Sequence, residues 1–296
     1  MPGGLLPVTF RPGRRPPIRT RARVKLRPHL RTAMPPPASV NWFEHVAAWP
    51  MYMNDRIGDC AIVMEAHALQ ATSTYGSGST ISVSDDDVLP VYERVSGYNP
   101  DDPSSDVGCI LQAVYADWRR TGIAGHKAAA FAEVEPSDLD EIKSAVYLLG
   151  TVGLGIVVTA QMMTDFDSGK DWTRAGGRSL GGHAVVIVGY DDTGVWIVTW
   201  GKVIKMTWSV FRRVVDEAWV AILPEWLDAN GLDPLGVDLY GLGEELHALT
   251  GDPNPFPAPD PTPVAPGPAP APGPDVDPSD VELAAALKKW LATTGL

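Results

Sequence analysis

Residues 183–201 read HAVVIVGYDDTGVWIVTWG. Two β-branched runs, HAVVIVGY and GVWIVTW, flank the polar segment DDT. Short runs of this kind, bounded by Gly and Asp, are typical of β-strands, and the residues between them favour a tight turn. The stretch therefore predicts an antiparallel hairpin.

The sequence on either side of this hairpin predicts the fold class. VGLGIVVTA (152–160) and EAWVAIL (217–223) read as two more strands. The preceding segments have the apolar spacing or the capping residues of helices; they are CAIVMEAHALQATSTY (60–75), DVGCILQAVYADWRRTGI (106–123) and SDLDEIKSAVYLLG (137–150). The acidic runs DDDVLP and NPDDPSSD read as solvated turns. Helices followed by antiparallel strands predict an α+β fold, with an N-terminal helical half and a C-terminal sheet or barrel half.

Composition divides the chain into four regions. Residues 1–38 form a basic, Pro/Arg-rich arm, and residues 39–250 have ordinary globular composition. Residues 251–278 contain 12 of the 28 prolines and predict a semi-stiff linker. Residues 279–296 carry a capping-box pattern and an apolar stripe over 279–294, which together predict a short amphipathic helix.

Charge is distributed unevenly between the arm and the rest of the chain. Residues 1–31 carry eight Arg and one Lys and no acidic residue, although the whole chain has a net charge of -12. Three interpretations stay open: a solvated tail, docking on the protein's own acidic surface, or binding to an anionic partner such as nucleic acid. Phe10 is the only aromatic residue in the arm, which weakens a base-stacking role.

Cys60 is a candidate nucleophile because it opens a predicted helix. A helix N-terminus favours a thiolate, and the preceding Gly58 and Asp59 leave room for a substrate near the backbone. Taken alone, a cysteine at such a place is more often a packing residue. His183, at the start of a buried strand, is a candidate base, and Asn54 could donate to an oxyanion.

NDRIGDC, GGHAVVIVGYDD and VTWGK together resemble the papain-like cysteine peptidases. Their pattern is a Gln, a G-x-C at a helix start, a His opening a strand, and Asn-Ser-Trp-Gly after the next strand. The resemblance covers roughly residues 39–220 and includes a group of phage and actinobacterial proteins with NDxxGDC, GGHAV and VTWGK. It implies a papain-like fold with the site between its halves, Cys60 as nucleophile, His183 as base and Asn54 in place of the Gln. The supporting positions are Gly58, Asp59, Gly182 and Trp200.

The third member of the family's triad, an Asn, is absent from this sequence. Either Thr199 or Val198 takes its position, depending on a one-residue gap. The Thr199 hydroxyl could hydrogen-bond the imidazole of His183, whereas a valine could not. Asp191 and Asp192 are less favoured candidates for the same orienting role.

We expect neither a metal nor a cofactor, because no HExxH, paired CxxC, phosphate-binding or dinucleotide-binding pattern occurs. Cys109 is expected on an apolar helix face in the core. No apolar run approaches the ~20 residues that span a bilayer. The sequence also predicts no secretory signal, so a location in the cytoplasm of the producing cell or in a virion is expected.

Two function classes follow, with a third behind them. The leading hypothesis is a cysteine hydrolase that cleaves amide bonds of peptides or peptidoglycan. The alternative is an inactive structural or binding module of a phage particle, with residues 1–31 and 279–294 contacting other phage proteins. Nucleic-acid binding through the arm is weaker, because the rest of the chain is acidic.

Overall fold

The computed structural model describes residues 11, 13–31, 35–227 and 236–259. These residues belong to one compact unit that ends at Pro257, apart from the last two, Ala258 and Pro259. The helix predicted over 279–294 and most of the proline-rich linker lie outside the described residues. Within the described part of the chain, no helix is long and apolar enough to cross a membrane.

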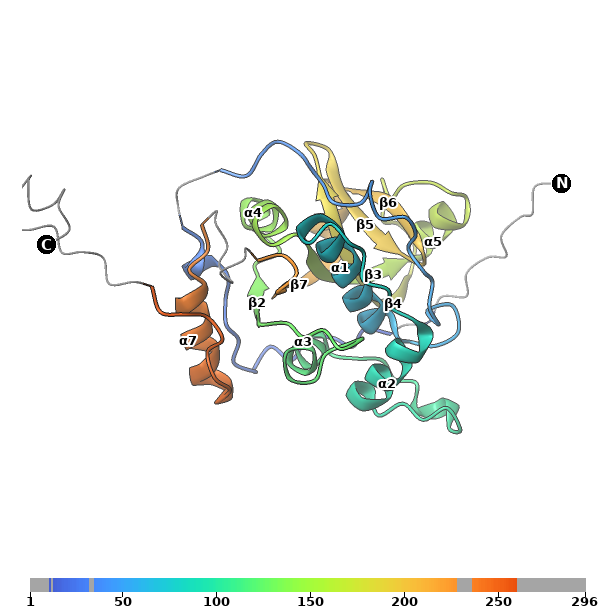
Figure 1. The fold of residues 1–296 in the computed structure, drawn as a ribbon. Helices are drawn as coiled ribbons and strands as arrows, with labels where there is room; N and C mark the ends of the chain where they lie inside the picture. Colours follow the sequence, from blue (N-terminus) through green and yellow to red (C-terminus); the bar gives the residue numbers. More distant parts are fainter. Residues whose placement is uncertain (1–10, 12, 32–34, 228–235, 260–296) are drawn as a thin grey trace, which may run out of the picture. The chain divides into compact units, whose positions relative to one another are not determined.

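The described residues form a mixture of helices and strands (Figure 1). The helices are α1 (Cys60–Gly76), α2 (Asp85–Ser96), α3 (Leu111–Arg120), α4 (Leu139–Leu149), α5 (Ala160–Asp167), α6 (Trp208–Val214) and α7 (Leu239–Thr250). The strands are β1 (Val40–Asn41), β2 (Ala130–Val134), β3 (Val152–Thr159), β4 (Ser179–Tyr190), β5 (Gly194–Thr199), β6 (Lys202–Thr207) and β7 (Val215–Ile222).

All of these strands belong to one antiparallel sheet in the order β2-β7-β3-β4-β5-β6, with β1 added beside β4. The predicted hairpin is confirmed, because β4 pairs with β5 and places Val186 opposite Val198. The α+β class is confirmed as well. The sheet is not confined to the C-terminal half, since β2 comes from residues before α4 and pairs with β7 at one edge.

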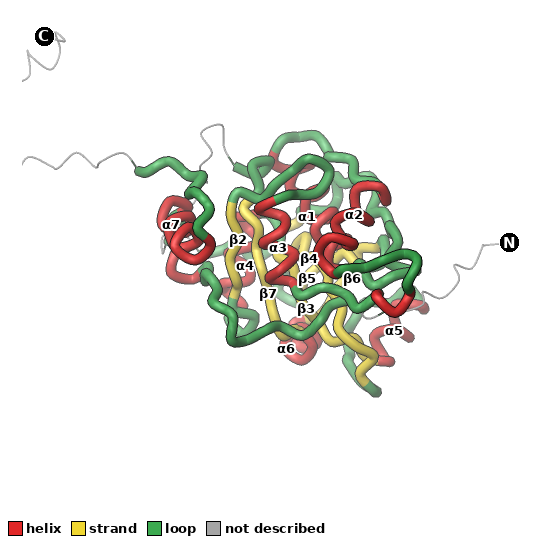
Figure 2. Tube along the Cα trace, turned by 90° about the horizontal axis from the view of Figure 1, so that it is seen from below, coloured by secondary structure: helices red, strands yellow, loops and turns green. Residues whose placement is uncertain are grey.

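Helix α1 is the central helix of the fold, and residues 60–73 of it are all buried. It packs against β4 and β3, whereas α3 packs against β2 and β7. Figure 2 shows the strands lying between α1, α2 and α3 on one side and α6 on the other. Because α1 is buried all round, its first residue, Cys60, lies deep in the molecule.

One of the acidic runs was wrongly predicted as a solvated turn. DDDVLP forms the start of α2, and Ser84 and Asp87 make a reciprocal capping box there. Three acidic residues in the first turn suit the positive end of a helix dipole. Pro90 lies within α2 one turn further on, still close to its N-terminus.

The basic arm is part of the folded unit rather than a separate tail. Val24 and Leu26 are buried in the core, with exposed fractions of 2% and 0%. The arm runs beside β2, where the N–H of Glu133 donates to the carbonyl of Val24 at 2.8 Å. Arg23 and Lys25 form ion pairs with the buried Glu133 carboxylate. The arm thus covers an edge strand, which would otherwise expose unpaired backbone groups.

Candidate active site

The structure brings the N-terminus of α1 against β4. Cys60 is the first residue of α1, and its side chain is almost fully buried. The backbone N–H of Ala184 donates a hydrogen bond to Cys60 Sγ at 3.3 Å. Because Ala184 directly follows His183, the two residues predicted as nucleophile and base lie in adjoining segments of the fold.

His183 is held by two contacts that come from the end of β5. Its Nε2 shares a hydrogen bond of 2.9 Å with Thr199 Oγ1. Its ring stacks on the indole of Trp200, with centroids 4.3 Å apart and planes 11° apart. Val198 instead faces Val186 and Val203 in the sheet. Of the two neighbouring residues, Thr199 is therefore the one that contacts the imidazole.

Trp200 lies in the two-residue turn between β5 and β6. Its φ is 43° and that of Gly201 is 71°, so both residues adopt the left-handed conformation of a tight hairpin turn. That conformation is unusual for a tryptophan and is maintained only where the surroundings hold it. The edges of Phe166 and Trp172 contact the indole at centroid distances of 4.9 and 6.3 Å. The turn and these rings together present a flat apolar face to His183.

The loop before Cys60 is fastened by buried polar contacts. Asn54 Nδ2 donates to Asp59 Oδ1 at 3.0 Å, so one of its amide protons is directed to Asp59. The N–H of Gly58 donates to Asp106 Oδ1 at 2.9 Å. Burial raises the pKa of Asp59 to about 7, although the Asn54 bond opposes the shift. The Asp59 carboxyl group therefore gains or loses its proton near neutral pH.

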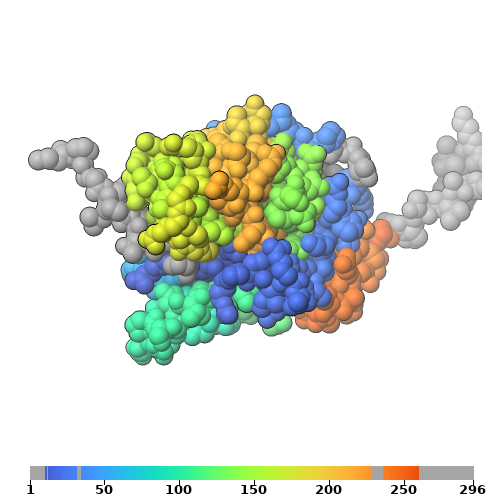
Figure 3. All heavy atoms as spheres, turned by 180° about the vertical axis from the view of Figure 1, so that it is seen from behind, coloured from blue at the N-terminus to red at the C-terminus, as the bar shows by residue number. Residues whose placement is uncertain are grey.

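The arm crosses the site directly above the thiol. A Cβ on Gly13 would lie 2.8 Å from Cys60 Sγ and 2.3 Å from the Gly58 carbonyl oxygen, so no larger residue fits there. The N–H of Arg14 donates to the carbonyl of Gly182 at 3.3 Å. Figure 3 shows the dark-blue arm lying across the molecule between the teal segment and the yellow-green and orange segments.

The other side of the arm pairs with Cys109. The N–H of Cys109 donates to the Gly13 carbonyl at 2.8 Å, and its carbonyl accepts from Arg15 at 2.7 Å. Cys109 is buried as predicted, but the prediction of a helix face was wrong, because α3 begins only at Leu111. Its extended backbone provides an edge for the arm, a role that the helical interpretation concealed.

Arg14 sends its side chain into the protein beside this crossing point. The guanidinium contacts Glu217 Oε1 at 3.2 Å, Asp216 Oδ2 at 2.9 Å and the Ile156 carbonyl at 3.1 Å. Sequence reasoning missed this residue. The available signal was the excess of arginine in the arm opposite an acidic domain, which indicated docking without indicating a partner.

Burial keeps both the thiol and the imidazole neutral in this state. It raises the pKa of Cys60 to about 12, and the Asp59 carboxylate adds to the shift, against hydrogen bonds from Ala184 and Gly13. Burial also lowers the pKa of His183 to about 3, and the cation of Arg14 contributes in the same direction. A thiolate–imidazolium pair therefore requires water or substrate in place of the arm.

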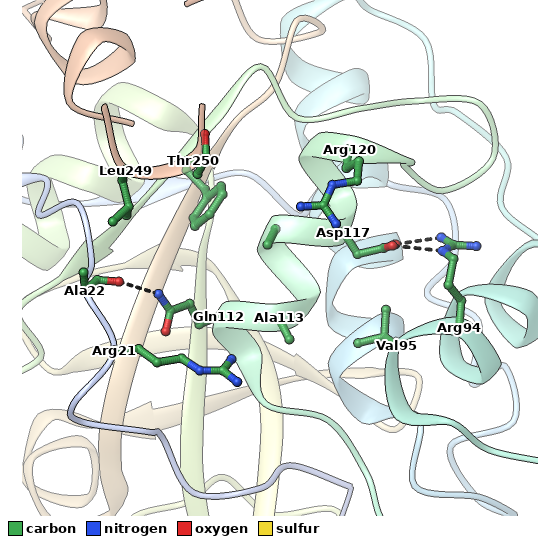
Figure 4. Close-up of a pocket in the computed structure, with 12 residues that line it drawn as sticks. Arg21, Ala22, Arg94, Val95, Gln112, Ala113, Asp117, Arg120, Leu249 and Thr250 are labelled. Carbon is green, nitrogen blue, oxygen red and sulfur yellow. Dashed lines mark hydrogen bonds and ion pairs between the residues drawn. The ribbon is translucent and has the colours of Figure 1, made fainter. Parts of the chain in front are cut away.

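A second depression lies away from this site (Figure 4). It has a volume of about 480 Å³ and is lined by the arm at Arg21 and by residues of α2, α3, β2 and α7. Arg94 and Asp117 form a two-point ion pair there, at 2.9 and 2.7 Å. The depression contains neither a cysteine nor a histidine, so Cys60 remains the candidate reactive centre. Among the described residues, no three His, Cys, Asp or Glu side chains gather to hold a metal ion.

Comparison with known proteins supports the fold assignment. No family model matches the chain, and no curated protein matches it. Xylellain, a cysteine protease from Xylella fastidiosa, is similar in structure, with a TM-score of 0.50 and 15% identity over 65% of this chain and 91% of that one. The cysteine protease CMS1MS2 of Carica candamarcensis gives a TM-score of 0.49 and 15% identity, over 62% of this chain and 98% of its own. The ragweed pollen allergen Amb a 11, a cysteine protease in its proform, gives 0.49 and 14%, over 64% and 66%. The chain thus has a papain-like fold, as predicted.

Proposed function

We propose that this protein is a papain-like cysteine hydrolase that cleaves amide bonds, with Cys60 as nucleophile and His183 as base. The observation that carries the proposal is the meeting of Cys60, at the start of a buried helix, with the strand segment that bears His183. The similarity of fold to known cysteine proteases supports the same reaction class.

In the proposed reaction, His183 takes the thiol proton and Cys60 Sγ attacks the carbonyl carbon of the substrate. The Cys60 backbone N–H and Asn54 stabilise the oxyanion. Collapse of the intermediate breaks the C–N bond, and His183 returns the proton to the leaving amine. Water then hydrolyses the thioester, which releases the acid and restores the thiol.

We assign the orienting role of the family's missing Asn to Thr199. Its hydroxyl engages Nε2 of His183, which leaves Nδ1 as the nitrogen to exchange a proton with Cys60. Trp200 stacks on the ring and keeps it in plane. A hydroxyl both donates and accepts, so it can stay bonded to the imidazole in either protonation state.

The arm makes the described state a latent one. Gly13 touches the thiol, so a substrate carbonyl reaches Cys60 only after residues 13–15 leave the crossing point. Once water enters, the burial that raises the thiol pKa is relieved, and the helix N-terminus then favours the thiolate. We expect a peptide or a peptidoglycan cross-link as substrate.

The test is alkylation of the full-length protein combined with an assay of amide hydrolysis. A thiol-directed probe should label Cys60, and both labelling and hydrolysis should disappear in Cys60→Ala. The matched control is Cys109→Ser, which removes the other thiol and should retain both signals. The proposal fails if hydrolysis by a purified, folded sample is unaffected by Cys60→Ala.

The alternative function, a binding or structural module of a phage particle, has one observation in its favour. The arm fills the site and ties it with buried ion pairs, as a purely structural segment would. In that case opening the arm would expose Cys60 without producing hydrolysis. The same pair of assays separates the two functions.

A further inference from the structure

The side chain of Arg14 occupies an acidic pocket next to the thiol. Three acceptors surround its guanidinium: the Glu217 carboxylate, the Asp216 carboxylate and the Ile156 carbonyl. Arg14 and Glu217 side chains are 2% and 1% exposed, whereas Asp216 is 35% exposed. Glu217 therefore forms the floor of the pocket, and Asp216 lies nearer to its mouth.

The pocket is shaped around this cation by residues that do not touch solvent. Glu217 Oε2 accepts from the indole N–H of Trp219 at 3.0 Å, which directs the other carboxylate oxygen, Oε1, toward the guanidinium. A Cβ on Gly155 would lie 2.5 Å from Glu217 Cγ and 3.1 Å from Arg14 Nε. Glycine at 155 is thus required for both the carboxylate and its cationic occupant to fit.

A buried carboxylate of this kind needs a cation. Removing one partner of a buried ion pair leaves the other charge uncompensated, which costs about 3–5 kcal/mol. Burial already raises the pKa of Glu217 above its usual value, against the opposing effect of Arg14. When the arm leaves, the pocket is left with an unpaired acid that a new cationic side chain would stabilise.

The pocket also has a fixed position relative to the reactive centre. Arg14 directly follows Gly13, the residue that contacts Cys60 Sγ, and its backbone is held by Gly182 on one side and by Cys109 on the other. A peptide that replaces the arm along the same two edges would place one side chain in the acidic pocket while its neighbour lies over the thiol.

We infer that this pocket is the specificity subsite of the hydrolase and that it selects an arginine side chain of the substrate, with Arg14 as its internal occupant. The inference rests on the proposed function. Arginine suits the pocket better than lysine does, because its planar fork serves three acceptors in different directions, while an ammonium is a compact point charge.

The experiment vacates the pocket in the full-length chain with Arg14→Ala. Two acetylated tripeptide amides, Gly-Arg-Gly and Gly-Leu-Gly, are then compared for binding and for protection of Cys60 from iodoacetamide. The arginine peptide should bind at least about tenfold more tightly, as expected for a charge-paired contact in a buried site. It should also slow alkylation, since it covers the thiol as Gly13 does.

Two double variants identify the source of the preference. Arg14→Ala with Glu217→Gln should lose it, while Arg14→Ala with Asp138→Asn should keep it, because Asp138 pairs with Arg27 away from the pocket. Equal binding of the two peptides, arginine preference that survives Glu217→Gln, or arginine binding that leaves alkylation unchanged would each overturn the inference.

The outcome is independent of catalysis. Arginine-selective protection without Cys60-dependent hydrolysis would disprove the proposed reaction and leave the pocket as an arginine site. Hydrolysis with no preference between the peptides would do the reverse. If Arg14→Ala does not fold, Arg14→Lys keeps a cation in place, and the arginine peptide should still outcompete the leucine peptide against it.

Discussion

Arg14→Ala should expose Cys60 to small thiol reagents. The substitution removes the guanidinium that joins the arm to Glu217 and Asp216, while the backbone contacts at Gly182 and Cys109 remain. The arm then opens more often over the thiol, and the rate of alkylation follows the population of the open state.

The magnitude comes from the burial of the pair. Arg14 and Glu217 are both almost fully buried, which places the loss at about 3–5 kcal/mol, whereas the half-buried Asp216 adds little. Protonation of Glu217, whose pKa is already raised, favours the lower end. A loss of about 3 kcal/mol corresponds to roughly a hundredfold increase in the open population, because about 1.4 kcal/mol equals a factor of ten.

The assay follows iodoacetamide modification by intact-protein mass spectrometry in a Cys109→Ser background, so that Cys60 is the reporting thiol. Arg27→Ala serves as the control, because Arg27 is 63% exposed and its pair with Asp138 lies on the surface. Its effect should stay below about fivefold. An Arg14→Ala protein that unfolds normally but is alkylated at the wild-type rate would refute the reasoning.

Three further predictions concern stability and catalysis. Leu26→Ala should lower the free energy of unfolding by about 2–5 kcal/mol in urea titrations, while the half-exposed Leu249 should tolerate alanine within about 0.5 kcal/mol. Thr199→Val should lower kcat/KM for a peptide amide by about 10- to 100-fold, through loss of a bond to the charged imidazole of His183, and Thr199→Ser should largely restore it. Asp59 has a pKa of about 7 in the folded protein, against an ordinary value of 3.8, so its contribution to stability is present at acid pH and is lost as pH rises to about 7; Asp59→Asn should therefore gain stability relative to wild type between pH 4 and 8.

Each of these has a clear opposing result. Equal unfolding free energies for Leu26→Ala and wild type would mean that the arm is not part of the folded core. Equal kcat/KM values for the valine and serine variants at position 199 would remove the hydroxyl from the mechanism. A stability difference between Asp59→Asn and wild type that does not change with pH would show that the carboxyl group titrates normally.

Local sequence chemistry was sufficient for several features. The alternation and turn residues of 183–201 predicted the β4–β5 hairpin, and the apolar spacing after Cys60 predicted α1. DDDVLP was misread even though its signal was local, because the acidic run was taken as solvated rather than as the charged first turn of α2. Such features depend on contacts between residues a few positions apart, which the sequence displays directly.

Other features depended on the tertiary structure. Whether Thr199 or Val198 faces His183 was decided by the register of β5 and the left-handed turn at Trp200. Arg14 meets Glu217 across 203 positions of the chain, and no local pattern marks either as the partner of the other. The sequence by itself determined which helices and strands form and which residues could do chemistry. Only the folded chain decided that the arm covers the thiol, because the free energy of that contact comes from burying charges and backbone groups that lie far apart in sequence.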